Sequence, residues 1–113
     1  MPQIVRCGLI QAANCEPAES PIEKIKRAMI DKHVAMIEDA ARQGVQIICL
    51  QELFYGPYFP AEQNPHWYDL TERIPDGPTT RLMQELARRH LLAGARRDAD
   101  INQAFVDAAC FEP

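Results

Sequence analysis

The chain has 113 residues, of which 47% are hydrophobic and 25% charged, and its formal net charge at pH 7 is −4. This length allows one domain, and the acidic balance provides no basic face, which argues against a nucleic-acid partner. No apolar run approaches the roughly 20 residues that cross a bilayer, and the start of the chain has no signal-like apolar region. We therefore expect a folded, cytoplasmic protein with no membrane partner.

Two short apolar runs predict the strands of the fold. Val5–Gln11 and Val45–Leu50 have few polar positions and the length of a buried strand. Cys7 and Cys49 lie inside these runs, where a cysteine usually packs as a small buried hydrophobe. The cysteines and histidines of the chain lack the spacing of zinc ligands, so we expect no metal site.

A long helix is predicted between these strands. Ser20, Pro21 and Glu23 have the pattern of a capping box with proline at the first helical position, and Gly44 is placed to end the helix. His33 falls close to the apolar stripe and is predicted to be a hydrogen-bonded residue at its border. Apolar residues recur between these ends at helical spacing, at Ile22, Ile25, Met29, Met36, Ile37 and Ala40. The strand–helix–strand order predicts a βαβ unit with parallel strands.

A long loop rich in proline and aromatic residues follows, over residues 55–78. Pro57, Pro60 and Pro65 are expected to break any helix there. Loops of this length are usually binding walls or lids, but rings in such a loop also serve as satellite core that covers the strand ends. Both interpretations stay open for the rings of this loop, Tyr55, Tyr58, Phe59 and Trp67.

Pro78 is predicted to start a second helix. Its apolar stripe is Leu82, Met83 and Leu86, whereas Arg81, Arg88 and Arg89 are expected to form a solvated face. Residues 91–95 are apolar enough for a short third strand.

Glu52 is the strongest candidate for a chemical role. It directly follows the second predicted strand, and in α/β proteins ligands bind outside the carboxyl ends of the strands. A carboxylate beside aromatic rings is partly removed from water, which suits a general base. Glu62 lies in the same loop, where it would orient the base or a substrate amine, or simply be solvated.

Three segments carry a resemblance to a known family. The run 51–59, QELFYGPYF, with Ala61, Glu62 and Gln63 behind it, resembles the first catalytic segment of the nitrilase, or carbon-nitrogen hydrolase, superfamily. The opening run 5–11 and the segment 74–80 fit the same family in the right order. The resemblance covers residues 4 to about 90, and it is closest to the N-carbamoyl amidohydrolases, which are β-ureidopropionase-like and N-carbamoylputrescine amidase-like enzymes.

The resemblance implies an α/β fold, namely the N-terminal part of a nitrilase-type α-β-β-α sandwich. It also implies a mechanism without metal or organic cofactor, in which a cysteine, a glutamate and a lysine act together. Of these three, only the glutamate maps onto this chain, at Glu52. Tyr55, Tyr58, Phe59 and Glu62 are the candidates for the substrate pocket. The substrate of the complete enzyme would be a small N-carbamoyl or amide compound.

The resemblance fades after His90. Residues 91–113 contain no lysine, and Cys110 lacks the strand and helix of a nucleophile elbow. We therefore expect an N-terminal hydrolase portion over 1–90 and a divergent or truncated tail over 91–113. Residues 101–107 resemble the family's following strand distantly, which fits an internal shortening, an altered reading frame or an aberrant end.

The resulting hypothesis is a truncated carbon-nitrogen hydrolase that is inactive alone. Its complete relatives would hydrolyse N-carbamoyl amines or N-carbamoyl β-amino acids to an amine, carbon dioxide and ammonia. The alternatives are a non-catalytic truncated homologue or assembly partner, and a fragment of an aliphatic amidase or nitrilase. A chain of this kind is expected to be a homo-oligomer or an aggregation-prone fragment, because its sheet edge stays open.

Overall fold

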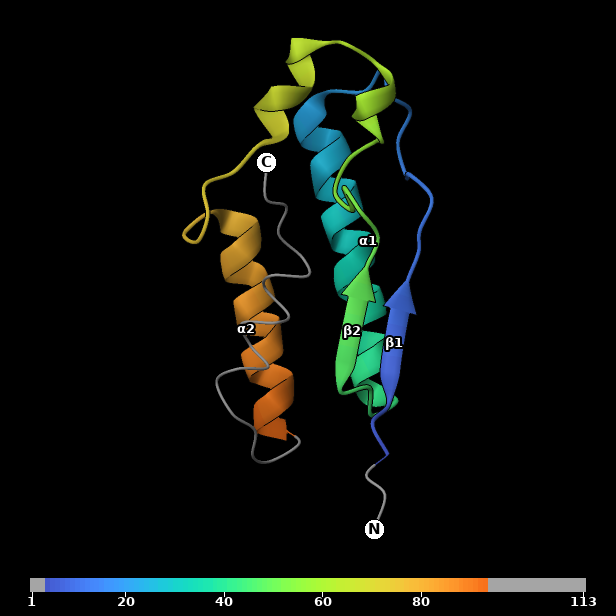
Figure 1. Ribbon diagram of the computed structural model, residues 1–113, viewed down its shortest axis with the longest axis vertical. Helices are drawn as coiled ribbons and strands as arrows, with labels where there is room; N and C mark the ends of the chain where they lie inside the picture. The colour runs from blue at the N-terminus through green and yellow to red at the C-terminus, as the bar shows by residue number, and fades with distance from the viewer. Residues whose placement is uncertain (1–3, 94–113) are drawn as a thin grey trace.

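The computed structural model describes residues 4–93, with side chains to residue 90. Its elements are β1 (Cys7–Ile10), α1 (Ile22–Arg42), β2 (Ile47–Leu50), η1 (Phe59–Ala61), η2 (Pro65–Leu70) and α2 (Pro78–Ala93). The two strands are parallel and side by side, with Cys7 opposite Ile47 and Ile10 opposite Leu50 (Figure 1). The predicted α/β class and the parallel βαβ unit are therefore confirmed.

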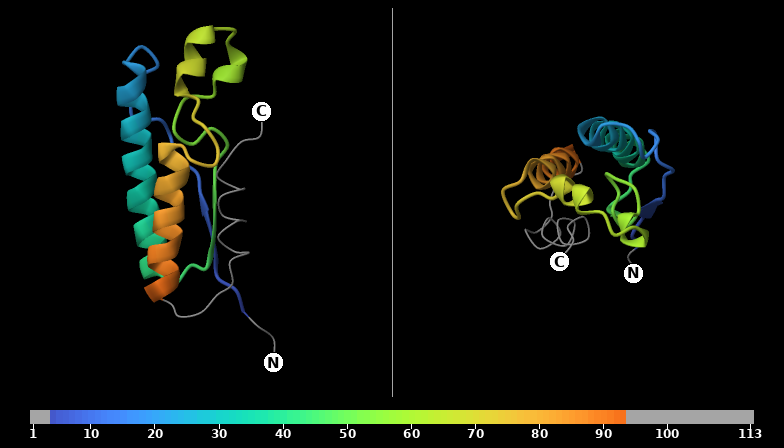
Figure 2. Two further views of the ribbon diagram at one scale, coloured as in Figure 1. Left: turned by 90° about the vertical axis from the view of Figure 1, so that its left-hand side faces the viewer. Right: turned by 90° about the horizontal axis from the view of Figure 1, so that it is seen from above.

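Both α-helices lie on the same side of this sheet (Figure 2). The main core fills the space between them and the strands, and it comprises Ile10, Ile37, Ile48, Leu50, Phe54, Met83 and Leu86. The short helices η1 and η2 lie beyond the arrowhead ends of the strands, near the start of α1 (Figure 1). No helix of the described residues is long and apolar enough to span a membrane.

The strands are shorter than predicted, and the described residues bury only one face of the sheet. Leu9 is 76% exposed and Ile47 is 51% exposed, whereas Ile10 and Leu50 are buried. Successive side chains of a strand point to opposite faces, and within residues 4–93 only the face toward the helices is covered. The prediction that Cys7 and Cys49 are buried is wrong for the same reason, since both lie at exposed positions.

The start of α1 differs from the predicted capping box. Pro21 is the N-cap residue, and its carbonyl accepts hydrogen bonds from the backbone N–H groups of Lys24 and Ile25. Ser20 lies one residue too early to cap, and its hydroxyl donates instead to Glu16 at 3.4 Å. The end of α1 agrees with the prediction, because Gly44 adopts a left-handed conformation with φ of 77°.

His33 is fully buried, not at the border of the apolar stripe as predicted. Its Nδ1 lies 2.8 Å from the carbonyl oxygen of Met29, one turn earlier in α1. A carbonyl oxygen only accepts, so Nδ1 carries the proton. The other ring nitrogen, Nε2, is buried without a hydrogen-bond partner among the described residues. The predicted hydrogen bond is confirmed, but the residue belongs to the core.

The aromatic loop contains two 3₁₀ turns, although proline was expected to break any helix. Pro60 lies inside η1 and Pro65 starts η2. Proline suits the first positions of a helical turn, because its φ is preset and it needs no N–H partner there.

The second helix begins at Pro78 as predicted and continues to Ala93. The third strand predicted over 91–95 is therefore wrong for residues 91–93. No glycine or proline interrupts residues 79–93, so the amphipathic helix runs on. The proposed boundary after His90 falls within this helix. The strand expected over 101–107 and Cys110 lie outside the described residues.

Candidate active site

Glu52 occupies the first position of a turn that leaves the carboxyl end of β2. The side chain of Gln51 just before it accepts a hydrogen bond from the backbone N–H of Ala12, which follows β1. This contact ties the carboxyl ends of the two strands together beside Glu52. The carboxylate of Glu52 is exposed in the described part of the chain, so the expected partial removal from water is not present there.

The turn after Glu52 is strained. Leu53 has a φ of 53°, in the left-handed region that leucine rarely adopts. The backbone N–H of Gly56 donates to the carbonyl of Leu53 at 3.2 Å and closes the turn. Such conformations cost about 1–3 kcal/mol, persist only where surrounding structure imposes them, and cluster at active sites. The left-handed Leu53 directly after Glu52 is therefore a local strain of the kind that active sites often contain.

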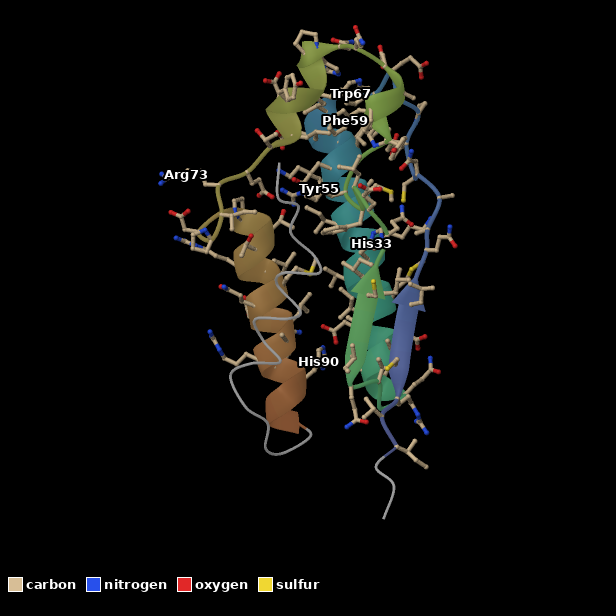
Figure 3. All side chains as sticks on the ribbon, in the orientation of Figure 1. His33, Tyr55, Phe59, Trp67, Arg73 and His90 are labelled. Carbon is tan, nitrogen blue, oxygen red and sulfur yellow. The ribbon has the colours of Figure 1, made fainter. Side chains whose placement is uncertain are left out.

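Phe54 anchors this turn in the core. Phe54 is 1% exposed. The centre of its ring lies 5.1 Å from the centre of the His33 imidazole and 5.2 Å from the centre of the Tyr55 ring, both edge to face. Phe54 therefore fixes this turn to the core of the domain. His33, Tyr55, Phe59 and Trp67 follow one another along α1, from the carboxyl end of β2 toward η2 (Figure 3).

The predicted pocket rings have different environments. Phe59 packs against a second buried cluster formed by Ile25, Trp67 and Leu70, and Tyr55 contacts both this cluster and the main core. Phe59 and Trp67 thus act as satellite core, the alternative considered from the sequence. Tyr58 is 64% exposed. Its contact with a substrate stays a prediction.

Glu62 organises the loop that contains η2. Its Oε2 accepts a hydrogen bond from the indole N–H of Trp67 at 3.0 Å, and its Oε1 accepts one from the amide of Asn64 at 3.3 Å. These two hydrogen bonds, that from Trp67 foremost, and the nearby charge of His66 hold the pKa of Glu62 below its ordinary value. Both oxygens therefore have structural partners, and a role toward a substrate amine stays a prediction.

A charged cluster near the turn was missed from the sequence. Lys26 lies in α1 outside the predicted apolar stripe, but its side chain is only 14% exposed and its ammonium lies 3.5 Å from Oε1 of Glu72. The same oxygen accepts the backbone N–H of Thr79 at 3.0 Å, and the Lys26 ammonium lies 5.0 Å from the centre of the Tyr55 ring. The available signal was helical spacing, because Lys26 lies three residues before Met29 and seven before His33, both of which are buried.

The arginines of α2 are exposed as predicted. Arg89 also pairs with Glu38 of α1 at 2.9 Å, and His90 lies 3.1 Å from the other oxygen of Glu38. Within residues 4–93, no group of three or more histidine, cysteine, aspartate or glutamate side chains is arranged to hold a metal ion.

Comparison with known proteins identifies the family. Residues 8–95 match the family model of carbon-nitrogen hydrolases. The chain belongs to the carbon-nitrogen hydrolase family. This membership confirms the resemblance drawn from the three segments, and the parallel strands with their helices are consistent with the N-terminal part of a nitrilase-type domain.

Several hydrolase relatives are similar to most of this chain. A β-ureidopropionase from Arabidopsis thaliana is 35% identical over 89 residues, which cover 79% of this chain and 22% of that protein. An omega-amidase from Homo sapiens is 30% identical over 95 residues, which cover 81% of this chain and 33% of that protein. A nitrilase from Pyrococcus abyssi is 33% identical over 70 residues, which cover 58% of this chain and 26% of that protein. The chain thus spans between about a fifth and a third of the length of these relatives.

Proposed function

We propose that this chain contributes the general base, Glu52, to the active site of a hydrolase that acts on N-carbamoyl amines or N-carbamoyl β-amino acids. The observation that carries the proposal is the placement of Glu52 at the carboxyl end of β2, on a turn held by the strained Leu53 and the buried Phe54. The similarity to a β-ureidopropionase supports the N-carbamoyl substrate class.

The proposed chemistry needs three groups. A cysteine thiolate attacks the carbamoyl carbon, a lysine stabilises the oxyanion, and Glu52 takes the thiol proton and passes it to the leaving amine. Glu52 then removes a proton from water, which attacks the thioester and frees the cysteine. The resulting carbamate breaks down to carbon dioxide and ammonia. The sequence of this chain offers a counterpart for the base alone.

An exposed Glu52 is compatible with this role. A base must reach its proton donor within hydrogen-bond distance, about 2.6–3.2 Å. A carboxylate presented at a strand end, on a backbone that its neighbours hold in place, is accessible to a nucleophile and a substrate supplied by other segments of a hydrolase. Part of its shielding from water would come from those segments.

A second candidate is hydrolysis of a plain amide or a nitrile. It uses the same base, and the omega-amidase and nitrilase relatives support it. A role as a non-catalytic assembly partner is the alternative outside enzyme chemistry. In that case Glu52 would have no effect on any turnover.

The test joins residues 1–90 to the remaining part of a related β-ureidopropionase. Glu52→Gln keeps the size of the side chain and removes the proton acceptor, so turnover of N-carbamoyl-β-alanine should fall about 10²-fold or more. Glu62→Gln is the matched control, because it alters a carboxylate of the same loop that already has structural partners. Glu62→Gln should lower turnover far less than Glu52→Gln does.

Two outcomes would redirect the proposal. If Glu52→Gln leaves the turnover of an active fusion within a few-fold of its parent, Glu52 is a structural residue of the strand end. If the fusion prefers an unsubstituted amide over N-carbamoyl-β-alanine and N-carbamoylputrescine, the second candidate replaces the first. Circular dichroism of each variant separates loss of the base from loss of the fold.

A further inference from the structure

Lys26 lies where three segments of the chain meet. Its ammonium is 3.5 Å from Glu72, in the segment between η2 and α2, and 5.0 Å from the centre of the Tyr55 ring, in the segment after β2. Glu72 in turn accepts the backbone N–H of Thr79 in the first turn of α2. A single side chain of α1 thereby connects the loop after Glu52 with the start of α2.

The side chains of this pair are largely removed from water, which restricts their geometry. The side chains of Lys26 and Glu72 are 14% and 10% exposed, so neither charge is well solvated by water. A buried charge is costly unless it keeps its partner, and the hydrogen bond from Thr79 further restricts the carboxylate. The ammonium therefore has little freedom to leave Glu72. It stays within the range of a cation–π contact with Tyr55.

We propose that Lys26 is a positioning residue for the turn that presents Glu52, an inference that rests on the proposed role of Glu52 as the base. Tyr55 is three residues beyond Glu52, inside the turn closed by Gly56 and Leu53. The left-handed Leu53 needs support from both sides to persist. The contact of Phe54 with the core is one support, and the contact of Tyr55 with Lys26 is a second one. Lys26 acts through Tyr55 and contacts no reacting atom.

The experiment measures amide hydrogen exchange by NMR in the 113-residue chain, without any need for turnover. Lys26→Met keeps the long apolar stem and removes the charge. We expect the Gly56 amide to exchange about tenfold faster, the effect of losing one partly desolvated cation–π contact. Lys26→Met also leaves the Glu72 carboxylate without its partner charge, so the amides of α1 and β2 should exchange somewhat faster, but by clearly less than the Gly56 amide. Lys24→Met is the matched control, since Lys24 is on the same helix, pairs with Glu16 at 3.3 Å and is 61% exposed. It should leave Gly56 unchanged.

Two further variants separate positioning from general stability. Lys26→Arg keeps the charge and should restore slow exchange at Gly56. Glu72→Gln keeps an oxygen for Thr79 and removes the partner charge, so the Lys26 Hε resonances should lose the upfield shift that the Tyr55 ring imposes. Equal effects of Lys26→Met and Lys24→Met at Gly56, or a uniform rise in exchange over the whole chain, would overturn the inference. If positioning holds here while Glu52→Gln proves harmless in the fusion, only the assignment of the base is wrong.

Discussion

The sheet face opposite α1 exposes apolar side chains, and we expect the chain to self-associate through it. Leu9 and Ile47 are large residues of this face, and Val5 just before β1 is also exposed. No described element covers these side chains. Leu9→Lys is the informative perturbation, because it places a charge near the middle of the face while leaving the helix-facing core untouched.

The exposed fractions of Leu9 and Ile47 set the free energy that association through this face can contribute. Full burial of a leucine or isoleucine side chain contributes about 1.5–3 kcal/mol. With Leu9 76% exposed and Ile47 51% exposed, covering both contributes about 2–4 kcal/mol per chain. The Leu9 share alone is about 1–2 kcal/mol per chain, or about 2–4 kcal/mol in a symmetric pair. Leu9→Lys should therefore weaken association at least about 30-fold.

Size-exclusion chromatography with light scattering checks this over a range of protein concentrations. The parent chain should form dimers or larger species, and Leu9→Lys should shift the mass toward the monomer. Ile74→Lys is the control, because Ile74 is 55% exposed but lies in the loop before α2. A parent that stays monomeric and unfolds cooperatively would refute the reasoning, since the face would then need no cover. So would an equal effect of both substitutions.

Three further predictions address activity, packing and pH. The purified chain should hydrolyse neither N-carbamoyl-β-alanine, N-carbamoylputrescine nor simple amides above a buffer blank, because the proposed mechanism needs three groups and the sequence offers a counterpart only for the proposed base, Glu52. Turnover that Cys110→Ala abolishes would make Cys110 the nucleophile. Phe54→Ala should lower the free energy of unfolding by about 3–5 kcal/mol, since Phe54 is 1% exposed. Tyr58→Ala should change it by less than about 0.5 kcal/mol, and equal effects in urea unfolding would contradict the packing described. The hydrogen bond from Trp67 holds the pKa of Glu62 below its ordinary value of 4.5. The ionised Glu62 carboxylate therefore stabilises the fold above pH 4.5, and this contribution is lost as pH falls through the lowered pKa. Glu62→Gln should remove this part of the acid dependence of Trp67 fluorescence, and identical acid profiles of parent and variant would count against it.

Local features were predictable from the sequence because they depend on nearby residues. Hydrophobic periodicity placed both strands and α1, Gly44 marked the end of that helix, and Pro78 marked the start of the next. These signals depend on backbone geometry over a few residues. The order of three family segments also led to the correct family. The location of Glu52 at a strand end followed from the same local pattern.

Burial and partners were decided by the tertiary structure alone. The exposure of Cys7 and Cys49 depends on which face of the sheet α1 covers. The partial burial of Lys26 depends on a partner 46 positions further along the chain, Glu72. His33 belongs to the core because Phe54 of a distant turn packs on its ring. The left-handed Leu53 has no signal in its residue type, since leucine does not favour that conformation. A sequence pattern specifies which side chains prefer to leave water, but only the packed chain determines which of them do so and what each one then contacts.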